Sequence, residues 1–133
     1  MSPPTGKNYS TPKPTDSELA ILRVLWQTGP ATVRAVHTEL NRVEPTGYTT
    51  VLKMLQIMTE KGLVVRDESQ RSHVYQPVHS EQSVQRRLVG HLLDRAFGGS
   101  AKQLVLQALS AKKATPRELA EIRKLLDEME GRC

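Results

Sequence analysis

The stretch from position 46 to position 56 places short hydroxyl side chains and a cation at helical spacing. These side chains share one face of a helix: Thr46, Thr49, Thr50, Lys53 and Gln56. A threonine hydroxyl can donate or accept a hydrogen bond at a base edge, and its methyl can contact a thymine methyl. A lysine one turn later suits a phosphate or a guanine edge. The pattern predicts a face that reads duplex DNA; the alternative is threonines that only cap and flank a helix start.

Two other places favour phosphate contact. Arg71 and Ser72 lie in a polar turn between two β-prone segments, although any exposed turn can carry an arginine. Thr32 and Arg34 begin another predicted helix, whose N-terminal amides and positive dipole end attract anions. These four residues complete the predicted DNA-contact set.

Three helices are expected to position these residues. Thr15 as N-cap and Glu18 three residues later form a capping box, and Gly29-Pro30 ends the first helix. The second helix covers about 32–41, and the third covers about 48–61 before a glycine at the C′ position. Apolar residues at 3- and 4-residue steps predict the buried stripes. They are Leu19, Ile21, Leu22, Leu25, Trp26, Val33, Val36, Leu40, Tyr48, Val51, Leu52, Leu55 and Met58.

A β-hairpin is predicted to follow the third helix. Residues 63–67 and 72–76 are β-prone and flank a polar turn, and Pro77 ends the second segment. Three helices and then a hairpin is the order of a winged helix-turn-helix, in which the third helix lies in the major groove and the hairpin, the wing, touches the backbone. The plainer alternative is a small helical domain with a surface hairpin and no ligand.

Composition narrows the class of protein. The chain has 133 residues, a formal net charge of +5 and only 4% aromatic residues, which favours an aliphatic, mainly helical core. The single cysteine, Cys133, excludes a disulfide framework and a cysteine-cluster metal site. The four histidines lack metal-ligand spacing, and no catalytic arrangement or phosphate loop is present, so we expect no cofactor, no metal and no enzyme activity. Without an 18-residue apolar stretch or a signal peptide, we expect a cytoplasmic protein that does not insert into a membrane.

The predicted organisation is a disordered arm over 1–14, a winged-helix DNA-binding domain over 15–79 and a three-helix region over 80–133. The last region is too short to bury a good core alone, yet its helices are apolar along one side. We therefore expect it to form a homodimer. The dimerisation residues are predicted to be Val84, Leu88, Leu92, Leu104, Leu119, Ile122, Leu126 and Met129.

Several short motifs agree in order with a known family. They are Leu19-Ala-Ile-Leu-Arg-Val-Leu-Trp26, Thr32-Val-Arg-Ala-Val-His37, Tyr48-Thr-Thr-Val-Leu-Lys-Met-Leu55, Glu60-Lys-Gly-Leu63 and Arg71-Ser-His-Val-Tyr-Gln-Pro77. Over about residues 15–130 the chain resembles the penicillinase-repressor family, the BlaI/MecI/CopY type. The resemblance implies a dimeric winged-helix repressor that binds a palindromic double-stranded DNA operator near resistance genes.

The resemblance also implies relief of repression when a membrane-bound zinc metalloprotease sensor, directly or through a cascade, leads to cleavage of the repressor. The matching bond here is Ala96-Phe97, although the residue before the phenylalanine is not the asparagine of well-known members. Phe97 has a plainer interpretation as a core residue between helices. Two further departures are Ile57, where family members often have a basic residue, and Cys133, which cannot supply the cysteine cluster of copper-responsive members.

The sequence thus predicts a homodimeric, sequence-specific transcriptional repressor. The rival hypothesis is a winged-helix protein-interaction module without specific DNA binding.

Overall fold

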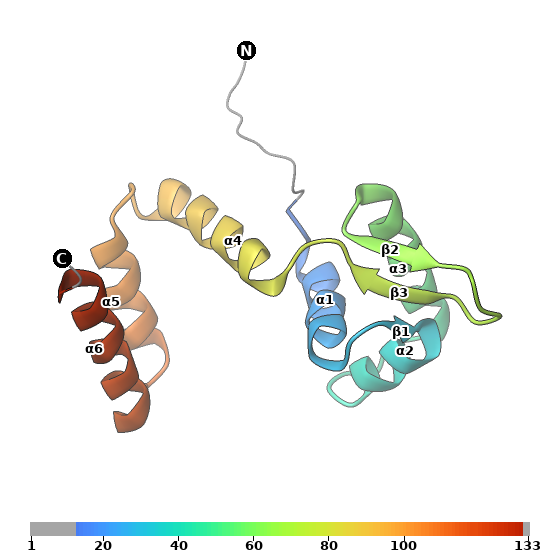
Figure 1. Cartoon of the computed structure of the whole chain (residues 1–133), viewed down its shortest axis with the longest axis horizontal. Coiled ribbons are helices and arrows are strands. Elements are labelled where there is room, and N and C mark those ends of the chain that lie inside the picture. Colours follow the sequence, from blue (N-terminus) through green and yellow to red (C-terminus); the bar gives the residue numbers. More distant parts are fainter. Residues whose placement is uncertain (1–12, 132–133) are drawn as a thin grey trace, which may run out of the picture. The chain divides into compact units, whose positions relative to one another are not determined.

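The computed structural model describes residues 13–131 and contains short strands among helices (Figure 1). In chain order the elements are α1 (Asp16–Thr28), β1 (Ala31–Thr32), α2 (Val33–Asn41), α3 (Tyr48–Lys61), β2 (Val64–Asp67), β3 (Val74–Pro77), α4 (Glu81–Ala96), α5 (Ala101–Ala111) and α6 (Pro116–Gly131). The described chain divides into two compact units, one ending at Val89 and the other beginning at Gly90. Most of the predicted arm over 1–14 and the terminal Cys133 lie outside the described residues.

The helix boundaries follow local signals in the sequence. Thr15 caps α1 through its side chain, which accepts from the N–H of Glu18, while the Glu18 carboxylate accepts from the N–H of Thr15 at 2.9 Å. Thr32 caps α2 by accepting from the N–H of Ala35. Gly62 ends α3 in the left-handed conformation, with φ of 82°, where a side chain would add strain. The predicted capping box and the predicted C′ glycine are confirmed.

The hairpin belongs to a three-stranded antiparallel sheet with strand order β1-β3-β2. Arg66 of β2 pairs with Tyr75 of β3, and Tyr75 also pairs with Ala31 of β1. The sequence did not predict β1, because a two-residue strand is too short to show an alternating pattern. With this strand added, the mainly α fold with a small β wing is confirmed, in the order of a winged helix-turn-helix.

One mainly aliphatic core joins α1, α2, α3 and the sheet. Its buried members are Ile21, Leu22, Leu25, Val33, Val36, Val51, Leu55, Met58, Leu63, Val64 and Tyr75. Trp26 lies at the edge of the core, and its indole Nε1 donates to the carbonyl of His79 at 3.1 Å. Tyr48 was predicted to be buried, and this prediction is wrong. Tyr48 is the first residue of α3, it precedes Val51, the first buried residue of that helix, and it is 46% exposed. We call residues 13–89 the winged-helix unit.

Helices α4 to α6 bury very little. Val84 is the one buried residue among them, and α5 and α6 bury none. Large apolar side chains are exposed along these helices: Val89, Leu92, Val105, Leu106, Leu119, Leu125, Leu126 and Met129. Val84 is only 2% exposed within the single chain, so it has little surface to offer a partner, contrary to its predicted place in the dimer contact. No helix among residues 13–131 is long and apolar enough to cross a membrane.

Candidate nucleic-acid interface

Helix α3 is tied at its C-terminal end to the start of α1. The ammonium of Lys61 donates to both carboxylate oxygens of Glu18, at 2.8 and 2.9 Å. Burial of Glu18 by itself raises the pKa of its carboxyl, but hydrogen bonds from Lys61 and Thr15 outweigh burial and hold that pKa below its usual value. Glu18 therefore serves two elements at once, as the capping-box acid of α1 and as the anchor of α3. The ion pair was not predictable from the sequence, because 43 residues separate the partners.

The outward face of α3 carries the predicted hydroxyl and cationic groups. Val51, Leu55 and Met58 face the core, and helical periodicity puts Thr49 and Lys53 on the opposite side, where both are exposed. Since a helix inserted into the major groove presents this side to base edges, these two residues form the central ridge of the candidate interface.

A groove lies on each side of this ridge. Thr50, together with Thr46, lines a groove of about 580 Å³ between α1, α2 and α3. Thr46 lies in the turn before α3, and its hydroxyl already donates to the carbonyl of Glu44 at 2.9 Å, which leaves it mainly as an acceptor. Ile57, 40% exposed, continues the exposed surface of α3 beyond Lys53. Thr46 is thus less available than Thr49 or Thr50.

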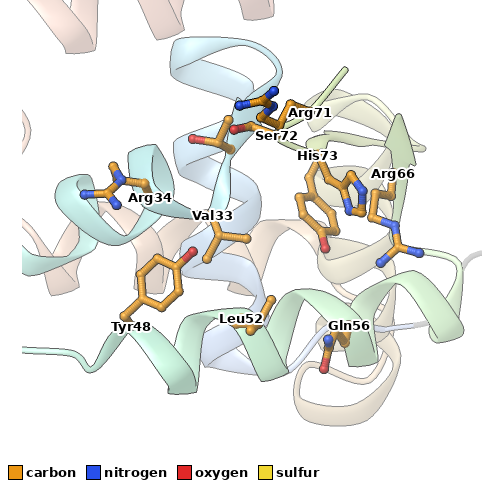
Figure 2. A pocket seen from close by; sticks show the side chains of 11 residues that line it. Val33, Arg34, Tyr48, Leu52, Gln56, Arg66, Arg71, Ser72 and His73 are labelled. Atoms are coloured by element: carbon orange, nitrogen blue, oxygen red, sulfur yellow. The ribbon is translucent and has the colours of Figure 1, made fainter. Parts of the chain in front are cut away.

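The other groove, of about 490 Å³, lies between α3, the start of α2 and the wing (Figure 2). It brings together five predicted contact residues that are far apart in the sequence: Thr32, Arg34, Gln56, Arg71 and Ser72. In Figure 2, Tyr48, Leu52 and Gln56 project from α3, Arg34 lies toward one end, and Arg66 and His73 lie toward the other. We call this the arginine groove.

The lining residues of the arginine groove that were not predicted as contacts include Tyr48, Arg66 and His73. Arg66 and His73 come from opposite arms of the hairpin. The alternation of side chains along β2 and β3 is the signal that would have found them, once the register was known. Tyr48 was missed because it was assigned to the buried stripe.

The arginines of this groove differ in how they are paired. Hydrogen bonds to Tyr75 and then to Glu68 raise the pKa of the Arg66 guanidinium, and Glu68 also neutralises part of its charge. Among the described residues, neither Arg34 nor Arg71 takes part in an ion pair, and both are exposed. These two guanidiniums are therefore free to bind anionic groups such as phosphates.

Several known proteins are similar to this chain. The chain is similar to the transcriptional regulator BlaI of Mycobacterium tuberculosis, with 33% identity over 117 residues, which is 87% of this chain and 84% of the relative. It is similar to the penicillinase repressor of Bacillus licheniformis, with 25% identity over 121 residues, 91% and 94% of the two chains. Among solved structures it is similar to the DNA-binding domain of the repressor BlaI, with 26% identity and a TM-score of 0.49, over 54% of this chain and 88% of that one.

The family model described as penicillinase repressor matches residues 14–128. This match includes α1 to α5 and most of α6, so it extends over both compact units. The chain belongs to the penicillinase repressor family, a family of transcriptional repressors.

Proposed function

We propose that this repressor acts as a homodimer that binds a palindromic operator with α3 in the major groove. The observation that carries the proposal is the position of Thr49 and Lys53 on an exposed ridge of α3, beside a groove lined by the unpaired Arg34 and Arg71. The ridge reads base edges, while the two guanidiniums in the groove beside it hold phosphates. Gln56 and Ser72 add neutral hydrogen-bonding groups to the same groove.

The apolar surface of α4 to α6 supports a two-fold contact between chains. Its proposed members are Leu88, Leu92, Leu104, Leu119, Ile122, Leu126 and Met129; Val84 is left out because the chain buries it. Leu88, Leu104 and Ile122 are half-buried in the single chain, whereas the other four are exposed. Exposed apolar side chains that repeat along helices are typical of an interaction surface. A two-fold dimer matches the symmetry of a palindromic site, and binding both half-sites raises affinity without any new contact to DNA.

Release from DNA is proposed to follow cleavage at Ala96-Phe97, in the cytoplasm, after a membrane metalloprotease sensor has acted directly or indirectly. Ala96 is the exposed last residue of α4, whereas Phe97 is half-buried and its N–H donates to the carbonyl of Leu93 at 3.2 Å. The last turn of α4 must therefore fray before a protease can bind this bond in extended form. Cleavage would separate α5 and α6 from the winged-helix unit. The gain in DNA affinity that comes from binding both half-sites at once would then be lost.

The experiment measures binding of the full chain to duplex from its own promoter and to random duplex, by fluorescence anisotropy over a range of salt concentrations. We expect preference for the promoter, with the logarithm of affinity falling linearly with the logarithm of salt concentration. Lys53→Ala should weaken binding to the promoter more than binding to random duplex, because Lys53 belongs to the ridge that reads base edges. Lys124→Ala, on the polar side of α6, is the matched control and should change neither affinity.

Equal affinity for promoter and random duplex at moderate salt would contradict the proposal. It would favour the alternative function, a winged-helix module that binds a protein.

A further inference from the structure

The turn before α3 is held by two side chains of α2. The N–H of Thr46 donates to Oδ1 of Asn41 at 2.7 Å, and the carbonyl of Thr46 lies 2.7 Å from Nε2 of His37. A carbonyl only accepts, so Nε2 must carry the proton and donate. Both backbone polar groups of Thr46 are thus bonded to α2, to two residues one helical turn apart.

This assignment also fixes the role of the asparagine. Its Nδ2 lies 3.2 Å from the same ring nitrogen of His37, but a protonated ring nitrogen has no lone pair to accept with, so the approach is a contact only. Rotating the Asn41 amide by 180° would place an N–H against the N–H of Thr46. The observed orientation is therefore the one that bonds the turn.

Helix α3 needs such an external support because it has no side-chain cap of its own. Thr15, Thr32 and Ser100 cap α1, α2 and α5 with their hydroxyls, whereas the N-cap of α3 is Gly47, with no side-chain hydrogen bond. The first turn of α3 is where Thr49 and Thr50 stand. An uncapped helix start frays easily unless its neighbours hold it.

An aromatic contact extends this support into the helix itself. The ring of Tyr48, the first residue of α3, lies edge-on to the ring of His37, with centroids 5.7 Å apart and an interplanar angle of 75°. Edge-to-face contacts of this kind are favourable and directional. Tyr48 also lines the arginine groove, so His37 contacts both the turn and a wall of the candidate interface.

We propose that His37 and Asn41 form a clamp on Thr46 that sets the orientation of the first turn of α3, and so of the threonines that read DNA. This inference rests on the proposed DNA-reading role of α3. His37 and Asn41 are positioning residues, because they act on base recognition through the turn and through Tyr48. Replacing either residue should reduce affinity for promoter duplex more than affinity for random duplex, because non-specific binding depends on phosphate contacts.

The test compares four full-length proteins: wild type, His37→Leu, His37→Gln and Thr38→Val. Leucine removes the donor at similar size, and glutamine restores an N–H donor at similar reach. Thr38→Val is the matched control, because it also removes one side-chain hydrogen bond of α2, to the carbonyl of Arg34, without contacting Thr46. Affinities for promoter duplex and random duplex are measured in parallel with amide hydrogen exchange of residues 46–50 in the DNA-free protein.

We expect His37→Leu to lose about tenfold to a hundredfold in affinity for the promoter, the worth of one good base contact, and little for random duplex. His37→Gln should recover most of this loss, and Thr38→Val should behave like wild type. Exchange of the Thr46 amide should become faster in His37→Leu alone. Unchanged promoter affinity in His37→Leu, or a glutamine variant as weak as the leucine variant, would overturn the clamp.

The exchange measurement separates the two hypotheses. If wild type shows no promoter preference, the proposed function fails, but faster exchange at Thr46 in His37→Leu would still support the clamp. If His37→Leu does not fold, the pair Asn41→Leu and Asn41→Asp gives the same exchange test, because aspartate keeps the acceptor for the N–H of Thr46. Equal protection of Thr46 in that pair would refute the clamp.

Discussion

The winged-helix unit and the tail, α5 and α6, use the same kinds of side chain with opposite results. In the winged-helix unit, Leu22 and Leu55 are 1% and 0% exposed, whereas in the tail Leu126 and Met129 are 58% and 78% exposed. Both regions have clear apolar stripes and good helix start signals. An apolar stripe on a helix forms a core only when other stripes and a sheet face it within the chain; otherwise it predicts a surface for another molecule.

The largest expected effect comes from a charge placed on the apolar side of the tail. Leu126→Asp should leave the chain monomeric at micromolar concentration, where we expect the wild type to be the proposed dimer, measured by sedimentation velocity. Affinity for a palindromic duplex should fall about 10²–10⁴-fold, while affinity for a half-site duplex stays the same, because only the bivalent gain is lost.

Ala120→Asp is the control for this change, since it introduces the same charge on the opposite, polar side of α6. A monomeric Ala120→Asp, or a dimeric Leu126→Asp, would contradict the proposed dimer surface.

Replacing one leucine by alanine in each region shows whether its burial occurs within one chain or between two chains. Leu55→Ala should lower the free energy of unfolding of the winged-helix unit by about 2–5 kcal/mol at any protein concentration, because it opens a cavity in a packed core. Leu126→Ala should change stability by an amount that depends on protein concentration, because its burial requires a second chain. Urea denaturation at two protein concentrations measures both. A cost for Leu126→Ala that is large and independent of concentration would mean that the tail packs within one chain.

The ion pair between Glu18 and Lys61 should make the winged-helix unit sensitive to acid. The pKa of Glu18 is held below its ordinary 4.5, so the stabilisation is complete above that pH and is lost as pH falls through the lowered pKa. Glu18→Gln should cost about 1–2 kcal/mol at neutral pH, less than a fully buried pair because Lys61 is 35% exposed.

Thermal unfolding of wild type and Glu18→Gln between pH 3 and pH 7 measures this effect. The two stabilities should converge at the acid end. A gap of constant size across that range would show that the charge of Glu18 contributes nothing.

The smallest expected effects come from two glycines with different backbones. Gly62→Ala should destabilise by about 1 kcal/mol, because alanine is strained at its φ of 82°. Gly90→Ala, inside α4 with open space around an added Cβ, should instead stabilise by about 0.5–1 kcal/mol. Thermal unfolding of both variants measures the difference in sign, and the same sign in both would contradict the assigned conformations.

Local signals made most of the fold predictable. The capping box of Thr15 and Glu18 and the C′ position of Gly62 depend on residues within one turn, so the sequence displays them directly. The two-residue strand β1 was missed because it has no period of its own and forms only by pairing with β3. Val84 was assigned to the dimer surface although the single chain already buries it, because an apolar stripe on α4 does not show whether the same chain or a second one covers it.

The candidate interface was predictable only where it depends on residues close together in the sequence. Helical periodicity was enough to place Thr49 and Lys53 on one exposed face of α3. The convergence of Arg34 with Arg71, and the presence of Arg66 in the same groove, depend on how the sheet packs beside α3. The contact of His37 with Thr46 was equally unpredictable, because its partner is a backbone carbonyl nine residues away, which any residue type would supply.

Amide NMR of the full chain during titration with promoter duplex tests whether the outward face of α3 reads DNA while the tail holds two chains together. We expect shifts at residues 48–57, at the start of α2 and at residues 66–73, with the resonances of α5 and α6 unchanged. Shifts centred on α5 and α6, or on α1, with α3 unaffected, would contradict these roles.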